Sequence, residues 1–390
     1  MNANGSDVRH GRQTAWLQEE SLCTALEPAA TDVLAEGINF DERLPLFPAQ
    51  PDDVSLLLEK YRSKASVLPQ LEAQFADVCG RWLTALFGLP QHTTLALTSD
   101  ASSALTRAMV AARSALCKRQ GLDAATLLRD GAPRLRVVVG GKPSPQFLRM
   151  LTGLGVREED VTVAPTDERG RLRVDILPPL DASTILIARA IGADSLAIDP
   201  LHELCEIAHR AGAWVHVDGA FGLWTATSAR YRHLVSGIGN ADSWSADAGS
   251  LPNVPHGCSI ALCREPDVFS DAMPGTAASN SHAVPLWTAL RQLGAEGIAQ
   301  LVDGRCDVAV RLSGKLRECG YDIENTAGSS RFVVKRNRFA EQLLPRGICR
   351  CYIAEWNGES ALWVDVQSAN ASSKELENRS CFCKSRKSHD

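Results

Sequence analysis

Asp218 is the residue whose place in the sequence points most directly to chemistry. It ends the apolar run Trp214–Val217 and is followed by small residues, in the string GAWVHVDGAFGLW. A short apolar run of this kind predicts a buried strand, and the small residues predict a turn. In open α/β sheets, ligands bind outside the carboxyl ends of the strands, so Asp218 is placed to meet one. A turn aspartate that caps the next element explains the same residue.

Other residue types with chemical potential give weaker patterns. Twelve cysteines are scattered along the chain, and without an apolar signal segment we expect reduced thiols and a cytoplasmic location. The pairs Cys349/Cys351 and Cys381/Cys383 suggest zinc, but their spacing is not the usual C-x₂₋₄-C and no paired histidines follow. We therefore predict no metal site. G-x-S-x-G, Walker A and H-E-x-x-H motifs are also missing from the sequence.

The composition sets the outer limits. The 390 residues are 45% hydrophobic and 22% charged, with a formal net charge of −5, which is typical of a globular chain and excludes disorder and coiled coil. No dominant basic surface is implied, so we expect no nucleic-acid partner. No apolar run approaches about 18 residues, so we expect no membrane span.

The elements that must position Asp218 are short apolar runs that alternate with helical segments. Such alternation predicts a mainly parallel sheet covered on both faces. The predicted strands are 95–97, 135–139, 161–164, 185–188, 214–217, 243–246 and 259–262, and the predicted helices between them are 102–120, 144–153, 201–211 and 228–236.

A second, smaller unit follows the sheet. Residues 283–320 have a helical apolar period, and RFVVK and ALWVDV read as strands of an α+β domain. We therefore divide the chain into four parts. They are an N-terminal arm with helices (1–90), a large α/β domain (91–282), a small C-terminal domain (283–368) and a loose polar tail (369–390).

The longer string AHRAGAWVHVDGAFGLW, followed by ADSWSADAGSLPNVPHGCSIALCREPD, resembles the group II pyridoxal-phosphate-dependent decarboxylases. These include the glutamate, tyrosine and aromatic amino-acid decarboxylases. The resemblance extends from about residue 65 to 320 in the expected order and also covers 71–90, 97–113, 137–145, 188–201 and 285–294.

The resemblance implies a fold, a cofactor and a partner. The fold is the fold-type I architecture, with a mostly parallel seven-stranded sheet in the large domain, and the assembly is a homodimer. The cofactor is pyridoxal 5'-phosphate and the substrate is an amino acid. Asp218 matches the aspartate that pairs with the cofactor's ring nitrogen. Ala220 matches the small residue against the ring, and Ser102 and Ser195 fall at further cofactor-binding positions.

The sequence departs from the family where the cofactor is anchored. The family's D-A-H-K-W-L-N-V-P is here DAGSLPNVP, so Ser250 occupies the place of the Schiff-base lysine and Gly249 that of the preceding histidine. A serine hydroxyl forms no imine with an aldehyde. Because the flanks match without a gap, we expect Ser250 to face Asp218 across a pocket. The sequence has no lysine between Lys142 and Lys315, so no near neighbour replaces it.

Three further departures lie at cofactor contacts. Asp100 replaces a glycine of the phosphate-binding turn, where its charge either repels a phosphate or caps the following helix. Ser144 aligns with the histidine that stacks on the ring. The family's N-T-G turn is Asp194-Ser195-Leu196 here. Cofactor binding is therefore doubtful on this pattern.

Two functions fit the sequence. The first is a lyase of the decarboxylase family, for which Lys142, two residues before Ser144, is a candidate replacement amine; a solvated loop lysine explains the same residue. The second is a catalytically silent homologue, dimeric, that binds a partner or a metabolite. A decayed or incorrectly assembled gene would leave the same departures. The sequence does not select an amino acid.

Overall fold

The computed structural model describes Leu44 and residues 68–121, 134–141, 143–192, 195–252, 254, 257–271, 282–325, 327–335, 349–356, 359–367 and 369. Most of the predicted N-terminal arm and nearly all of the predicted tail lie outside these residues. So do Lys142 and Asp194.

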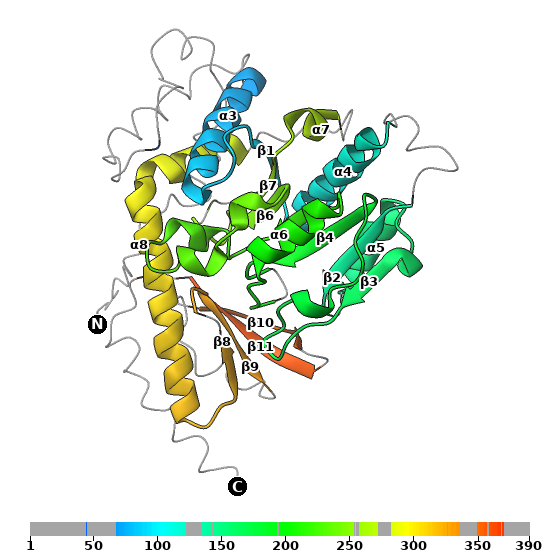
Figure 1. Cartoon of the computed structure of the whole chain (residues 1–390). Helices are drawn as coiled ribbons and strands as arrows, with labels where there is room; N and C mark the ends of the chain where they lie inside the picture. Colours follow the sequence, from blue (N-terminus) through cyan, green and yellow to red (C-terminus); the bar gives the residue numbers. More distant parts are fainter. Residues whose placement is uncertain are drawn as a thin grey trace, which may run out of the picture.

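A seven-stranded sheet forms the centre of the large domain (Figure 1), in the order β1-β7-β6-β5-β4-β2-β3. Strands β3, β2, β4, β5 and β6 are parallel, and β7 runs antiparallel to both β6 and β1. The predicted fold class and all seven predicted strands are confirmed. Their bounds are β1 Thr94–Thr98, β2 Arg136–Gly140, β3 Val161–Ala164, β4 Thr184–Arg189, β5 Trp214–Asp218, β6 Ser243–Asp247 and β7 Ser259–Cys263.

Helices cover both faces of this sheet because successive strand residues point to opposite sides. Val137 and Val139 of β2 pack in one apolar cluster, whereas Val138 between them packs in the other. The first cluster lies under α4 (Ala101–Arg119), α5 (Pro145–Gly153) and α7 (Pro266–Asp271). The second lies under α3 (Leu68–Phe87), α6 (Leu201–Arg210) and the start of α8 (Ala283–Glu318).

One predicted helix is wrong. Residues 228–236 form turns and a short 3₁₀ segment, Arg232–Val235. The Ser228 hydroxyl accepts hydrogen bonds from the backbone N–H groups of Arg230 and Tyr231, both at 3.1 Å. A side-chain oxygen used in this way offers the backbone a turn in place of an α-helix.

The small domain is a four-stranded antiparallel sheet in the order β10-β11-β9-β8. Its strands are β8 Ile323–Asn325, β9 Arg331–Lys335, β10 Cys349–Trp356 and β11 Glu359–Val366. The long helix α8 reaches from α3 to this sheet (Figure 1) and is kinked at Gly294, where φ is 63°. Within the described part of the chain, no helix has the length and apolar character needed to cross a membrane.

Candidate functional site

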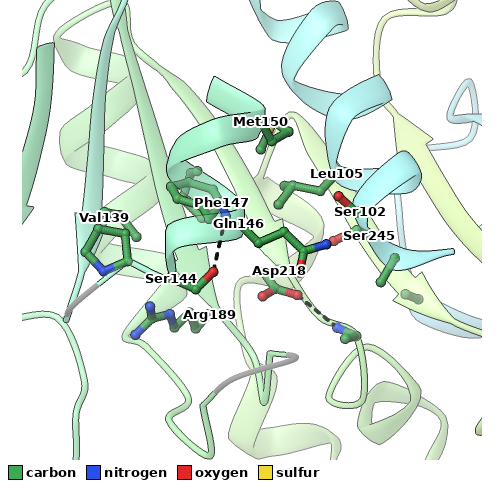
Figure 2. A pocket seen from close by; sticks show the side chains of 15 residues that line it. Ser102, Leu105, Val139, Ser144, Gln146, Phe147, Met150, Arg189, Asp218 and Ser245 are labelled. Atoms are coloured by element: carbon green, nitrogen blue, oxygen red, sulfur yellow. Dashed lines mark hydrogen bonds between the residues drawn. The ribbon is translucent and has the colours of Figure 1, made fainter. Parts of the chain in front are cut away.

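A cavity of about 290 Å³ lies at the carboxyl ends of the parallel strands, beneath α4 and α5 (Figure 2). The end of a parallel sheet is where ligands bind in open α/β folds. The cavity is lined by Ala101, Ser102 and Leu105 of α4, Pro143, Ser144, Gln146, Phe147 and Met150 at α5, Val139 of β2, Ile187 and Arg189 of β4, Asp218 and Ala220 at the end of β5, and Ser245 and Ala246 of β6.

The structure brings together four of the residues that the sequence singled out for this site. Asp218, Ala220, Ser102 and Ser144 all line the cavity. The Asp218 carboxylate Oδ1 accepts a hydrogen bond from the Ala220 N–H at 3.3 Å, which turns the chain back toward the cavity after β5. Asp218 therefore stands at the end of a buried strand and faces a ligand-sized space.

Ser195 and Ser250 do not line the cavity. Ser195 is buried, and its hydroxyl oxygen accepts the Ala197 N–H at 3.0 Å. The expectation that Ser250 faces Asp218 across a pocket is therefore wrong for its side chain. The reason lies in the turn after β6, where a nearer acceptor captures the hydroxyl.

That acceptor is Asp247. The Ser250 hydroxyl donates to Asp247 Oδ2 at 2.6 Å, and the Gly249 N–H donates to Asp247 Oδ1 at 2.9 Å. On the other side, Arg305 Nη1 of α8 donates to the Ser250 carbonyl at 2.5 Å. The turn at the family's lysine position is thus a closed hydrogen-bonded unit that presents no nucleophile to the cavity.

Asp100 caps α4. Its Oδ1 accepts the Ser103 N–H at 2.8 Å, and its Oδ2 accepts the hydroxyls of Ser103 at 2.7 Å and Ser99 at 3.1 Å. Partial burial raises the pKa of this carboxyl, but hydrogen bonds from Ser103, Ser99 and Ser102 outweigh it and hold the pKa below its usual value. Of the two interpretations that the sequence allowed for Asp100, the structure shows the helix cap. An anion already occupies the helix end where the family binds a phosphate.

Ser144 has a similar role one helix later. Its hydroxyl oxygen accepts the Phe147 N–H at 3.2 Å and so caps α5, with Pro145 in the first turn. The residue at the ring-stacking position is therefore a helix cap with no aromatic face.

Arg189 is a lining residue that sequence reasoning missed. It ends β4 directly beside Asp218 in the register of β4 and β5 and is only 9% exposed. The backbone N–H of Arg189 donates to the buried Asp199 carboxylate at 2.6 Å. The guanidinium of Arg189 lies against Gly141, where a Cβ atom would come within 3.1 Å of Nη1. The sequence shows a cation at the end of an apolar run, but only the pairing of β4 with β5 places Arg189 beside Asp218.

A buried histidine supports the floor of the site. His216 of β5 is fully buried, and burial lowers its pKa to about 3, so the imidazole is neutral. The Ser243 hydroxyl oxygen accepts the Trp214 indole N–H at 2.9 Å and lies 2.9 Å from His216 Nδ1, while Ser245 Oγ of the cavity lining lies 3.3 Å from His216 Nε2. Both ring nitrogens of His216 thus have a hydroxyl partner in the floor of the site.

Comparisons with known proteins define the class. Residues 67–278 match the family described as the pyridoxal-dependent decarboxylase conserved domain, and the chain belongs to that family. It is 31% identical over 196 residues to aspartate 1-decarboxylase of Aliivibrio fischeri, covering 46% of this chain and 36% of that protein. It is 29% identical over 171 residues to mouse cysteine sulfinic acid decarboxylase, covering 42% of this chain and 33% of that protein. The matches thus span about a third of the length of these relatives.

Solved structures show the same fold. The glutamate decarboxylase domain of the diaminobutyrate-pyruvate transaminase and L-2,4-diaminobutyrate decarboxylase from Vibrio parahaemolyticus superposes with a TM-score of 0.69 at 17% identity, over 89% of this chain and 80% of that chain. The Oryza sativa TDC with PLP and tryptamine gives a TM-score of 0.66 at 17% identity, over 82% of this chain and 76% of that chain. At these identities the likeness concerns the fold.

The family implies pyridoxal phosphate, so the cavity can be tested against it. The described lining residues include no amine that could form an imine. Ser250, at the position of the family's lysine, donates its hydroxyl proton to Asp247. The N-terminus of α4 already binds the Asp100 carboxylate. Asp218 and Ala220 would suit the ring of the cofactor. Ser250 at the lysine position and Asp100 at the N-terminus of α4 do not fit a covalently held pyridoxal phosphate. We derive no reaction step through it.

Proposed function

We propose that this member of the pyridoxal-dependent decarboxylase family has lost imine formation, and with it ordinary amino-acid decarboxylation, and acts as a non-covalent small-molecule-binding protein. One observation carries the proposal: the Ser250 hydroxyl is committed to Asp247 Oδ2 at 2.6 Å and supplies neither an imine nor a proton-transfer amine. The other departures, Asp100 and Ser144, are both caps of helices beside the same cavity.

The intact packing of the fold around the cavity supports a role in binding a small molecule. The sheet, its two apolar layers and the small domain are well packed, and two of the departures lie at the cavity: Ser144 lines it, and Asp100 directly precedes the lining residue Ala101. That cavity has mainly apolar walls and a few convergent polar groups, which is the usual form of a small-molecule site. Its volume of about 290 Å³ suits a small metabolite.

The experiment is a titration of the purified protein with pyridoxal phosphate, read as aldimine absorbance before and after borohydride. We expect no saturable, reducible band for the wild type and little for Ser250→Lys. The variant Asp100→Gly/Ser144→His/Gly249→His/Ser250→Lys should bind more cofactor than either. Thr152→Lys, at an exposed position of α5, measures the background from a surface lysine. A stoichiometric reducible band in the wild type would overturn the proposal.

A second candidate function is a decarboxylase that uses a different amine, with an amino acid as its substrate. Lys142 lies outside the described residues; in the sequence it stands between Gly141, which packs against Arg189, and Pro143, which lines the cavity. If this amine had taken over, the wild type would show the reducible band and Lys142→Arg would lose it. The same titration therefore separates the two functions.

We also propose that the protein is a homodimer in the cytoplasm. The motivation for the dimer is the family resemblance, and that for the location is the number of cysteines, nine of which are free thiols in the described residues. Sedimentation at tens of micromolar protein tests the dimer, and a well-folded monomer would contradict it.

A further inference from the structure

The backbone turn at Ile191 lies between the small domain and the cavity of the large domain. In the described part of the chain, Ile191 is the one non-glycine residue with a positive φ, 53°. A β-branched residue is strained in this left-handed region, and such a conformation persists where the surrounding structure imposes it. We propose that Arg331 of the small domain is a positioning residue that holds this turn and, through it, the cavity wall at Asp218 and Ala220. The wall is then in place only while the small domain is docked, whether or not the protein forms an imine.

Hydrogen bonds within the large domain fix the backbone of the turn on both sides of the strained residue. The Ile191 N–H donates to the Ala197 carbonyl at 2.8 Å, and the Ile191 carbonyl accepts the Phe221 N–H at 3.1 Å. The second bond ties the turn to the segment after β5, where Asp218 and Ala220 line the cavity. Neither bond relieves the strain at φ, so other contacts must offset it.

The small domain supplies contacts that offset the strain. The Ile191 side chain is only 1% exposed and packs in an apolar cluster with three small-domain residues. These are Val333 of β9 and Ala361 and Trp363 of β11. Burial against this sheet is favourable. If the small domain moved away, the strain would remain and this burial would be lost, so the turn should relax to an ordinary φ.

Arg331 connects the same sheet to the next residue of the turn. Its Nη1 donates to the Gly192 carbonyl at 3.0 Å, and its Nε donates to Asp365 Oδ1 of β11 at 2.5 Å. The guanidinium also lies over the ring of Phe221, 4.0 Å from the centroid. One side chain of the small domain thus contacts both segments that the Ile191–Phe221 hydrogen bond joins.

Gly192 and Phe221 carry the position of the turn to the cavity. A Cβ atom at Gly192 would lie 2.4 Å from Asp218 Oδ2, so the glycine backbone packs directly on that carboxylate. Phe221 follows Ala220, whose N–H donates to Asp218 Oδ1 at 3.3 Å. A shift of the turn therefore moves both lining residues. By thermodynamic linkage, a ligand that contacts them strengthens the docking of the small domain by the same free energy.

Residue-resolved hydrogen exchange of the wild type and Arg331→Lys tests the coupling. Lysine keeps a cation beside Asp365 but lacks the planar guanidinium that reaches Gly192 and lies over Phe221. We expect the amides of Ile191 and Phe221 to exchange roughly 10- to 100-fold faster, the effect of losing one charge-assisted hydrogen bond. The amides of Ile260 and Leu262 in β7 should be unchanged, because the opening is local.

Two results would overturn the proposal. One is unchanged exchange at Ile191 and Phe221, and the other is an equal acceleration in β7, which would mean that Arg331 contributes only to global stability. Arg230→Lys is the matched control, since Arg230 also pairs with an aspartate and lies over a tyrosine ring, and it should leave both amides unchanged. If Arg331→Lys does not fold, Phe221→Leu removes the ring beneath the guanidinium and should accelerate the Ile191 amide in the same way.

A pair of variants at Ile191 tests the strain itself. Ile191→Gly and Ile191→Ala lose the same packing against the small domain, but only glycine adopts a positive φ without strain. We expect Ile191→Gly to be the more stable of the two in urea unfolding, which is the reverse of the usual order of glycine and alanine. An alanine variant as stable as the glycine variant would contradict the strained turn. Neither experiment involves pyridoxal phosphate, so their outcomes are independent of the proposed function.

Discussion

Asp100 shows how one side chain changes what a helix end can bind. The first N–H groups of a helix have no partner within it and attract anions. Here the chain supplies that anion itself, through three hydrogen bonds to Ser103 and Ser99. The residue therefore stabilises the helix and places a negative charge at its N-terminus.

A pair of substitutions at Asp100 separates the cap from the charge. Asp100→Ala should lower the free energy of unfolding by about 1 kcal/mol, because it removes an N-cap, whereas Asp100→Asn should cost much less. The lowered pKa of Asp100 means that its contribution is present above the ordinary pKa and is lost as the pH falls through the folded value. Urea unfolding at neutral pH measures both variants, and equal costs would contradict the cap.

His216 gives a pH dependence of its own. Burial lowers its pKa from 6.5 to about 3 in the folded state, so the unfolded chain binds the extra proton first as the pH falls. Its contribution is therefore complete above about pH 6.5 and declines between pH 6.5 and 3. We expect His216→Gln to show a shallower loss of stability across that window. The exposed His233→Gln is the control and should keep the wild-type slope; identical slopes for all three proteins would refute the buried neutral state.

The residue scale is also where sequence reasoning succeeded and failed most clearly. Asp218 was predictable because a carboxylate that ends an apolar strand lies at the carboxyl edge of an open sheet, where ligands bind. Arg189 was missed because its partner in the register, Asp218, belongs to another strand, and only the pairing of β4 with β5 brings them together. The inward direction expected for Ser250 failed because Asp247, three residues away, accepts its proton.

At the scale of elements, Gly222 allows the turn after β5 to pack closely against the end of β4. A Cβ at Gly222 would lie 1.9 Å from the Ala190 carbonyl oxygen and 2.4 Å from its carbon, so the turn after β5 touches the end of β4 through bare backbone. The same turn carries Asp218 and Ala220 to the cavity. The position of the cavity floor thus depends on this close approach.

Gly222→Ala tests that dependence. We expect it to lower the free energy of unfolding by about 3 kcal/mol or more, because backbone must move to admit the methyl group. Gly314→Ala in α8 is the matched substitution at a site with nothing within 4 Å, and we expect it to stabilise by about 0.5–1 kcal/mol. Chemical denaturation compares the two, and a neutral Gly222→Ala would show that the turn is placed differently.

The strands β4 and β7 were predictable because every residue in them is buried, so each reads as a continuous apolar run. The segment 228–236 was not, because its apolar spacing is helical while Ser228 binds two local N–H groups. Strand β10 was also missed. It is an edge strand with several exposed residues, including Ile353, so it lacks the apolar signal of a buried strand.

At the scale of the whole molecule, Arg331 joins the small domain to the large one. Its side chain is fully buried and donates through Nε to Asp365 Oδ1 at 2.5 Å and through Nη1 to the Gly192 carbonyl at 3.0 Å. Its guanidinium also lies over the ring of Phe221, 4.0 Å from the centroid. Gly192 in turn packs directly against the Asp218 carboxylate. The small domain therefore holds the loop that backs the candidate ligand site.

Arg331→Ala should cost about 3–5 kcal/mol of stability, because it removes the guanidinium that donates a hydrogen bond to the buried Asp365 carboxylate. Arg136→Ala, which breaks an exposed ion pair with Asp181, should change stability by less than about 1 kcal/mol. Equilibrium urea unfolding gives both values. A loss at Arg331 no larger than that at Arg136 would show that the domain contact contributes little.

The central claim concerns the whole protein: this fold of the decarboxylase family no longer forms an imine with pyridoxal phosphate. Intact-mass measurement after incubation with the cofactor and borohydride reduction tests it most directly, with Ser250→Lys and Thr152→Lys treated in parallel. We expect the wild type to stay unmodified, or to be modified no more than the surface background set by Thr152→Lys. Stoichiometric addition of one reduced cofactor to the wild type, mapped to a single lysine, would contradict it.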